Sequence, residues 1–518
     1  MTFDLMIPGQ LIGALLPDVV LMGGAMLLML LAAWRRESDA WQRVVAVGAL
    51  AVLAAAAAAV LWMMRLDADA SIGVIAVDRF RWATDLLCIV GAGFAIALMS
   101  EQNPRARLVA GEAHVLVLLA TAGMMIMAAA RDLMILFLGI ELMSIAVYVL
   151  VAMDRRRERS AEAGLKYFLL GAFSTAFLLY GVALIYGATG TTNLTEIGAR
   201  IILYKLADHP MLLFGVAFLL IGFGFKVAAA PFHMWSPDVY EGAPTPVTAF
   251  MAAAVKAAAF AAFLRIWIEA FPMVVLRWFG PIWWIAALTM VVGNIVALSQ
   301  KNVKRMLAYS SIAHSGYLLV AIASTTSMGS SAFLFYLLAY TLATFGAFAV
   351  VSVVSDGAER GTQLSDYEGL WQSRPWLAVG MTVFLLALLG FPVFGGMGFF
   401  AKWYLLQAAI ASPAPLVTLS VILVLTSVVS AGYYLHLVRV MFMKERDGAA
   451  AAVPASGPLT RLVLITTAVL ILVMGVAPER VATWSRLSAI GPAPSAISSL
   501  GADTPELMPP AVDPAARR

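Results

Sequence analysis

Three observations predict an all-α integral membrane protein with about fourteen transmembrane helices. Hydrophobic residues make up 62% of the 518 residues and charged residues only 12%, whereas a soluble globular domain carries about 25% charged residues. Apolar runs long enough to cross a bilayer recur throughout residues 1–483, which we interpret as one polytopic membrane domain. Two of these runs combine a lysine with helix-breaking prolines or glycines, which predicts helices that break inside the membrane.

The predicted spans start close to the N-terminus. The first apolar run is longer than the core of a signal peptide and no basic segment precedes it, so we expect a retained helix. Polar loops separate the later runs. In chain order, the predicted spans are 11–34, 44–64, 77–99, 113–130, 132–153, 161–187, 211–235, 245–271, 281–299, 303–323, 331–355, 375–408, 416–443 and 461–478.

Basic residues are distributed unequally between the loops. The odd-numbered loops, such as 35–43 and 154–160, contain most of the arginines and lysines outside the spans. The positive-inside rule then predicts that these loops lie in the cytoplasm and that both termini lie outside. The net charge of +4 is therefore explained by orientation in the membrane, and no nucleic-acid partner is expected.

Spans 7 and 12 each contain a predicted helix break. In span 7, Pro231 follows Lys226, and the proline ring clashes with the carbonyl group of Val227. A freed carbonyl at membrane depth persists only where protein or water satisfies it, so we expect a polar cavity there. The break in span 12 is predicted at Gly390, Pro392 and Gly395.

The positions of the two breaks predict an inverted repeat. Spans 7 and 12 are five apart, so they cross the membrane in opposite directions. We therefore expect one five-helix repeat at about 113–271 (spans 4–8) and a second at about 281–443 (spans 9–13). Residues 484–518 are rich in Pro, Ala and Ser and are predicted to form an extended or disordered tail.

Four ionisable residues lie deep in predicted spans: Glu141, Lys226, Lys256 and Lys402. A charge at the centre of a spanning helix costs roughly 2.5–3.5 kcal/mol on insertion scales, which makes such residues functional candidates. One glutamate cannot pair with three lysines, so at least two lysines need water, a carbonyl group or deprotonation. Because burial and nearby carboxylates change the proton affinity of an amine, these lysines suit a proton relay. A static Glu141–Lys226 bridge that only fixes helix packing is the alternative.

Several aromatic residues are supporting candidates for such a path. His233 follows the break in span 7, where it either relays protons or hydrogen-bonds freed carbonyl groups. His314 lies among hydroxyl groups in span 10 and either bridges the two halves or is structural. Tyr433 and His436 lie near the end of span 13.

The composition argues against a redox centre or metal site in this chain. Cys88 is the only cysteine, so the chain alone supplies no iron–sulfur cluster, disulfide or thiolate zinc site. No pair among the five histidines has helical spacing, which disfavours a bis-histidine haem, and no glycine-rich nucleotide loop is found. We expect no cofactor in this chain and electron carriers, if any, in other proteins.

Three segments resemble subunit N of bacterial NADH–quinone oxidoreductase (respiratory complex I), whose core is shared with other antiporter-like subunits. They are the run 231–248 with its PDVYEGAPTP core, the run 301–316, and the run from Gly390 to Lys402. The resemblance covers nearly all the spans. It implies a proton-translocating membrane-arm subunit with two broken-helix half-channels, in which Glu141, Lys226, Lys256 and Lys402 match the family's buried charged residues.

The resemblance also implies partners and a location. FMN and iron–sulfur clusters belong to other subunits of that enzyme, and quinone reduction elsewhere drives proton movement through this chain. The expected surroundings are other membrane-arm subunits, including antiporter-like siblings, together with lipid, water and protons in the bacterial plasma membrane. Two alternatives remain open: a subunit of a multisubunit sodium/proton antiporter, and a passive scaffold of the membrane arm.

Overall fold

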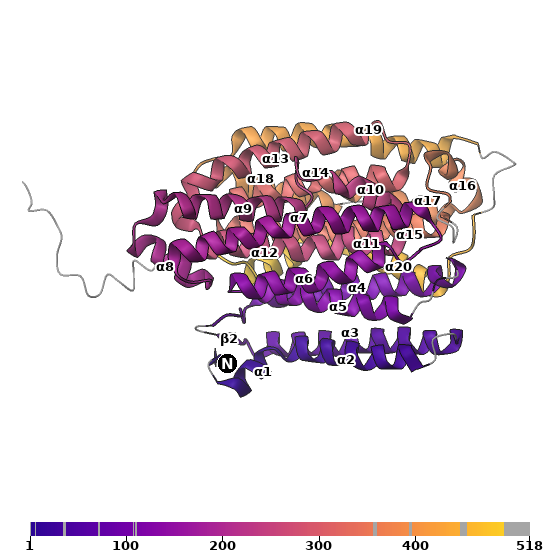
Figure 1. The fold of residues 1–518 in the computed structure, drawn as a ribbon. Helices are drawn as coiled ribbons and strands as arrows, with labels where there is room; N and C mark the ends of the chain where they lie inside the picture. Colours follow the sequence, from indigo (N-terminus) through magenta and orange to yellow (C-terminus); the bar gives the residue numbers. More distant parts are fainter. Residues whose placement is uncertain are drawn as a thin grey trace, which may run out of the picture.

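The structure is a computed structural model that describes residues 2–5, 7–34, 38–70, 73–106, 108, 111–355, 360–392, 396–445 and 453–491. Within them the chain is almost entirely helical, and the long helices lie side by side, with α2 and α3 at one edge and α19 at the opposite edge (Figure 1). The two strands, β1 (Thr2–Phe3) and β2 (Asp69–Ala70), pair only with each other. The predicted all-α membrane fold is confirmed.

The predicted number of spans is also confirmed. Among the described residues, twelve helical segments are long and apolar enough to cross a membrane. The shorter apolar helices α9 (Pro210–Lys226) and α17 (Pro375–Leu389) bring the total to fourteen. The long segments are α2 (Leu16–Trp34), α3 (Asp39–Arg65), α4 (Arg79–Ala106), α5 (Gly111–Ala129), α6 (Leu133–Val151), α7 (Glu158–Thr189), the continuous α11 (Thr245–Phe250), η2 (Met251–Val255) and α12 (Lys256–Glu269), then α13 (Val275–Ala297), α14 (Val303–Ala323), α15 (Ser327–Val354), α19 (Val417–Met443) and α20 (Pro458–Val476).

The remaining helices are short connections or the second parts of broken spans. They are α1 (Pro8–Ala14), α8 (Leu194–Leu203), η1 (Leu206–Asp208), α10 (Trp235–Gly242), η3 (Pro272–Val274), η4 (Leu364–Tyr367), α16 (Leu370–Ser373), α18 (Gly396–Ile410) and α21 (Pro478–Leu487).

Two predicted boundaries differ from the structure. The first predicted span contains two helices, because α1 ends at Ala14 and α2 begins at Leu16. The predicted tail begins inside α21, whose Pro478 and Glu479 at its start and Arg486 in its last turn are typical of helix ends. Residues 492–518 lie outside the described residues, so the extended tail stays a prediction there.

The two predicted repeats share a hydrogen-bond pattern. In the first, the backbone N–H of Leu133 donates to Thr192 and that of Leu194 donates to Arg131. In the second, Val303 donates to Thr362 and Leu364 donates to Lys301. The side chains that cap α6 and α14 hydrogen-bond the matching threonines, which are 60 residues away along the chain in both cases; these pairs are Asp132–Thr192 and Asn302–Thr362. This recurrence supports the predicted pairing of spans 4–8 with spans 9–13.

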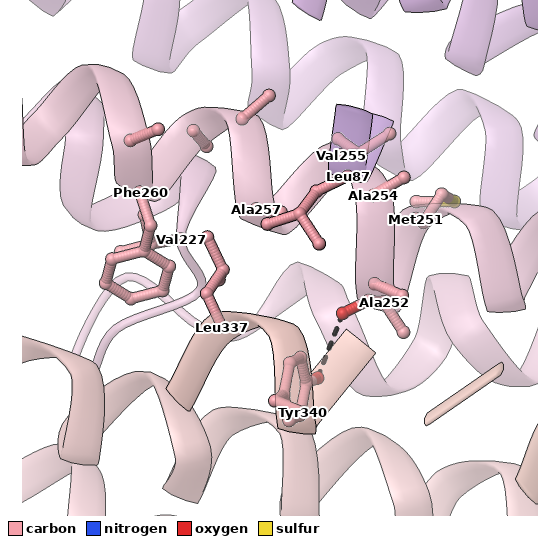
Figure 2. Packing of buried hydrophobic residues seen from close by; sticks show 14 of the residues in the cluster. Leu87, Val227, Met251, Ala252, Ala254, Val255, Ala257, Phe260, Leu337 and Tyr340 are labelled. Atoms are coloured by element: carbon pink, nitrogen blue, oxygen red, sulfur yellow. Dashed lines mark hydrogen bonds between the residues drawn. The ribbon is translucent and has the colours of Figure 1, made fainter. Parts of the chain in front are cut away.

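The centre of the bundle is formed by α11–α12, α14 and α15. In the most apolar 18-residue stretch of each of these segments, 100%, 94% and 94% of the residues are buried. Small residues allow this close packing, as where the π-helical η2 lies against α15 (Figure 2). There the hydroxyl group of Tyr340 donates to the carbonyl oxygen of Ala252 at 2.9 Å. A π-helical turn inside an α-helix often marks a functional position. Here it directly precedes Lys256.

A cluster of paired charges lies where α4 begins. Arg265 of α12 is fully buried and donates to both carboxylate oxygens of Asp78, at 2.7 and 2.9 Å, and to Glu269 at 2.8 Å. Asp78 also accepts a hydrogen bond from the backbone N–H of Arg81. Burial raises the pKa of Asp78, but the charge and hydrogen bonds of Arg265 outweigh it and lower the pKa to about 2. The ionised carboxylate therefore ties α4 to α12.

We expect Asp78→Asn to lower the free energy of unfolding near pH 7 by about 2 kcal/mol, which is the free energy that corresponds to the shift in the pKa of Asp78. Because the folded pKa lies below the unfolded one, this stabilisation is present above about pH 4 and is lost as the pH falls toward 2. Thermal unfolding of the purified chain in detergent over this range measures it. Asp208→Asn, which breaks an exposed pair with Arg277, is the control with little effect. Equal losses in both variants would contradict the assignment.

Candidate functional site

The first broken span places Lys226 against α6. Its Nζ atom donates to the hydroxyl group of Ser144 at 2.8 Å and lies 5.9 Å from the centre of the Tyr148 ring. Glu141 lies one turn before Ser144, on the same face of α6. Within the described residues Glu141 forms no ion pair within 4 Å, and its Oε1 atom is buried without a hydrogen-bond partner. The static Glu141–Lys226 bridge that the sequence left open is therefore absent from this conformation.

Lys256 is held entirely by neutral groups. Its side chain is 2% exposed, and Nζ donates to the carbonyl oxygen of Ser311 at 2.8 Å and to the hydroxyl oxygens of Ser311 and Ser315. Both serines belong to α14. The hydroxyl oxygens of Ser311 and of Tyr340 on α15 lie within hydrogen-bond distance at 2.8 Å, so α12, α14 and α15 meet at this lysine.

The break in span 7 connects directly to Lys256. Helix α9 ends at Lys226, and the hydroxyl group of Ser315 donates to the carbonyl oxygen of Val227 at 2.7 Å. The predicted freed carbonyl is therefore satisfied by a side chain. Ser315 also accepts from Lys256, so one hydroxyl group joins the first break to the central lysine.

The second break is arranged in a similar way around Lys402. Its Nζ atom donates to the carbonyl oxygen of Leu389, the last residue of α17, at 2.8 Å and to the hydroxyl oxygen of Ser427 at 3.0 Å. It lies 4.9 Å from the centre of the Tyr317 ring. At both breaks a freed carbonyl oxygen accepts a hydrogen bond from a polar side chain, and the lysine lies over a tyrosine.

The two breaks also end their first helices in the same way. Ala229 and Phe391 donate to the carbonyl oxygens five residues earlier, while Ala228 and Gly390 donate to those three residues earlier. This pattern needs a left-handed residue, and φ is +80° at Gly390 and +54° at Ala228. A left-handed alanine costs roughly 1–2 kcal/mol. The strain at Ala228 lies two residues after Lys226, as is common at functional sites.

Tyrosines and His314 fill the space between Lys256 and Lys402. The Nδ1 and Nε2 atoms of His314 lie 2.6 and 3.3 Å from the hydroxyl groups of Tyr336 and Tyr434. His314, Tyr336 and Lys402 also line a cavity of about 10 Å³, close to the smallest that holds one water molecule. A second series of hydrogen bonds approaches Lys402. The hydroxyl group of Tyr433 donates to the Asn294 amide oxygen, and the Asn294 amide nitrogen donates to the hydroxyl group of Tyr317, over whose ring Lys402 lies.

The remaining candidate residues lie outside these contacts. His233 is half-buried, and its Nδ1 atom has no hydrogen-bond partner among the described residues, so the structure does not join it to the contacts of the three lysines. His436 is exposed on α19, because two residues after Tyr434 the helix turns its side chain away from the bundle, and its place in the path stays a prediction. Pro231 and Pro392 lie in the turns after α9 and α17, and Gly395 lies outside the described residues.

Sequence reasoning missed most of the hydroxyl and amide groups that contact the lysines or lie between them. Their only signal was their place in apolar spans, one turn from a charged residue or a histidine, and the partner helix could not be read from it. The missed residues are Ser144, Asn294, Ser310, Ser311, Ser315, Tyr317, Tyr336, Tyr340, Ser427 and Tyr434.

The chemical character of the site follows from these partners. In the described part of the chain, Lys226, Lys256 and Lys402 have no carboxylate within 4 Å. A paired carboxylate would hold each proton on its amine, whereas hydroxyl groups and imidazole both donate and accept hydrogen bonds. The arrangement can therefore pass protons between neighbours. No group of three His, Cys, Asp or Glu residues among the described positions could hold a metal ion.

Comparison with known proteins places the chain among relatives with this architecture. Residues 130–430 match the family described as NADH:quinone oxidoreductase/Mrp antiporter, TM. The chain is 50% identical over 492 residues to NADH-quinone oxidoreductase subunit N of Gemmatimonas aurantiaca, an alignment that covers 93% of this chain and 94% of the relative.

Solved structures show the same fold. A chain of respiratory complex I from Thermus thermophilus is 36% identical, with a TM-score of 0.75, and the match covers 90% of this chain and 98% of that one. A chain of the Mrp complex from Dietzia is 21% identical with a TM-score of 0.77, covering 91% and 97% respectively. At that identity the likeness concerns the fold alone.

The matched helix ends predict opposite effects of exchanging alanine and glycine. Ala228→Gly should raise the free energy of unfolding by about 1 kcal/mol, because it removes the left-handed alanine. Gly390→Ala should lower it by more, because φ is positive and the added Cβ atom would lie 2.9 Å from Cδ of Lys402. Chemical unfolding of the purified chain in detergent measures both.

Two further substitutions serve as controls. Ala229→Gly, at a residue outside the left-handed region, should destabilise the protein, and Gly280→Ala, whose added Cβ meets nothing within 4 Å, should be neutral or stabilising. If Ala228→Gly and Ala229→Gly behaved alike, the strain at Ala228 would be refuted.

Proposed function

Because this chain belongs to the NADH-quinone oxidoreductase subunit N family, we propose that it translocates protons through the membrane arm of a bacterial respiratory complex. It is a multi-pass membrane protein with the antiporter-like fold. Quinone reduction elsewhere in the complex supplies the driving force. The chain is thus a subunit of an oxidoreductase and itself carries no redox centre.

One observation carries the proposal: a series of hydrogen-bonding side chains links the two broken spans through the centre of the bundle. Lys226 lies at the first break, Ser315 joins that break to Lys256, and Tyr340 continues from Ser311 toward His314, whose ring centre lies 5.0 Å away. Tyrosines and the small cavity lead on to Lys402 at the second break. Between the first break and Ser315 the contact is made by the backbone carbonyl oxygen of Val227, so we propose that water carries the proton from Lys226 to Lys256.

The proposed direction of transfer runs from the cytoplasm to the outside. Protons enter from the cytoplasm near Lys226 and Glu141, cross by Lys256 and His314, and leave near Lys402, with the odd-numbered loops in the cytoplasm and both termini outside. Glu141 controls the first lysine electrostatically. Movement of its carboxylate toward Lys226 favours the protonated amine, and movement away favours release.

Partners complete the proposed function. FMN and iron–sulfur clusters belong to other subunits, in keeping with a single buried cysteine, Cys88. Other membrane-arm subunits, including antiporter-like ones, contact this chain in the plasma membrane. Water enters the half-channels, and lipid surrounds the outer helices.

The family description also names Mrp antiporters, so sodium/proton exchange is the second candidate function. Sodium-dependent proton flux in vesicles that contain the chain, without NADH, would favour it. The neutral partners of Lys256 and Lys402 favour protons, because no carboxylate among the described residues lies within 4 Å of either amine. A passive scaffold is distinguished by the two variants that follow.

Glu141→Gln should reduce proton pumping severalfold while the complex remains assembled. The change removes the charge with almost no change in volume, and Glu141→Asp, which keeps a carboxylate, should retain more activity. NADH-driven acidification of proteoliposomes measures pumping, and a native gel measures assembly. The exposed Glu158→Gln is the matched control. Pumping at the native rate in Glu141→Gln would leave this glutamate with only a packing role.

Lys402→Arg should reduce pumping by roughly tenfold or more, because arginine keeps the charge but is effectively never deprotonated. Lys402→Ala removes the proton site and should be equally impaired, together with coupled quinone reduction. The exposed Lys205→Arg controls for the exchange itself. A Lys402→Arg variant that assembles and pumps normally would show that proton release from this residue is not required.

A further inference from the structure

A groove of about 660 Å³ runs along the outside of the bundle between α17 and α20. The wall on α17 is formed by Trp376, Val379, Gly380 and Val383, which share one face of that helix. The wall on α20 has the same kind of spacing and is formed by Leu464, Ile465, Ala468 and Leu472. Both walls are apolar.

One end of the groove is strongly basic. Arg374 and Arg461 line it, and Arg105 donates to the carbonyl oxygen of Ala455 beside it. Arg374 donates only to the carbonyl oxygen of Val453, and neither lining arginine has a carboxylate within 4 Å among the described residues.

The nearest acid leaves this end positively charged. Glu101 is engaged by the start of α20, where it accepts from the backbone N–H groups of Leu459 and Thr460 and from the Thr460 hydroxyl group. Three arginines against one glutamate leave an excess of positive charge, and the guanidinium groups keep free N–H donors suited to a phosphate group.

The length of the groove matches one leaflet of a bilayer. Arg461 and Leu472 are eleven residues apart on α20, which is about 16 Å along the helix axis. Half of the hydrocarbon core of a bilayer is about 15 Å thick. Both α17 and α20 begin at the basic end, so that end lies at the membrane surface and the apolar end lies near the midplane. Trp376, 86% exposed at the start of α17, is typical of the interface.

From this combination we propose that the groove binds one anionic phospholipid, with its phosphate group between Arg374 and Arg461 and an acyl chain along α17 and α20. The site goes beyond proton translocation and does not depend on it. It also bears on the second break, because α17 ends at Leu389, whose carbonyl oxygen accepts the hydrogen bond from Lys402. A lipid along α17 holds that half-helix in place.

The test uses the complete complex in detergent and a photoactivatable phosphatidylglycerol with the reactive group in its acyl chain. Labelled peptides are identified by mass spectrometry after titration with the lipid. We expect label in α17 and α20, at Val383, Ala468 or Leu472. The double variant Arg374→Gln/Arg461→Gln should weaken binding about 25-fold, since each basic residue near the surface contributes about fivefold. Arg439→Gln is the matched control without effect. This arginine is exposed near the C-terminal end of α19 and does not line the groove.

A second variant separates the apolar walls from the charges. Ala468→Phe fills the groove and leaves both arginines intact, so acyl-chain labelling should fall while α17 and α20 remain assembled on a native gel.

Several outcomes would overturn the proposal. These are equal labelling by the phosphatidylcholine analogue, native labelling in the double arginine variant, and displacement of the lipid by millimolar inorganic phosphate alone. A photoreactive amino acid at Ile465 that crosslinks to a neighbouring subunit instead of to lipid would assign the groove to a protein partner. These outcomes are independent of the pumping measurements on Lys402.

Discussion

The structure depends on satisfying the backbone groups that two broken helices leave free at membrane depth. No water competes for such groups in the bilayer core, so each unsatisfied one costs several kcal/mol. The carbonyl oxygen of Val227 accepts from Ser315, and that of Leu389 accepts from Lys402. These bonds fix α14 against α9 and place Lys402 at its break. The requirement that keeps the broken spans stable therefore also positions the polar side chains.

The helices α6 and α14 are capped in the same way but differ in chemistry nine residues after the cap. Asp132 and Asn302 cap α6 and α14 at matching positions. Counted from these caps, Ser311 occupies the position of Glu141. Glu141 lies near the lysine of its own half without an ion pair, whereas Ser311 accepts from Lys256 of the other half. The acidic group is thus at one end of the series of polar side chains, and neutral hydroxyl groups are at the centre of that series. A fixed carboxylate at the centre would trap the proton.

Sequence reasoning found the spans, both breaks and the three lysines beside them, because apolar runs, Pro231, Gly390 and a lysine within an apolar run are all local signals. It did not find the partners of those charges. Whether Ser144 or Glu141 contacts Lys226 depends on the rotation of α6 against α9, and a sequence without its neighbours does not specify this. For the same reason the sequence alone did not show that Tyr434 faces the bundle while His436 is exposed, since residues two apart on a helix face different ways.

Charged side chains are buried in two ways in this protein: with carboxylate partners, and with neutral partners. Arg265 has two carboxylate partners, Asp78 and Glu269, and removal of one partner leaves a buried charge uncompensated. Such a cluster resists any change of protonation and suits a fixed joint between α4 and α12. Lys256 has only hydroxyl and carbonyl partners, so loss of its proton leaves no uncompensated carboxylate behind. In the proposed mechanism, the absence of a counter-ion, which lowers stability, allows the central lysine to exchange a proton with its neighbours.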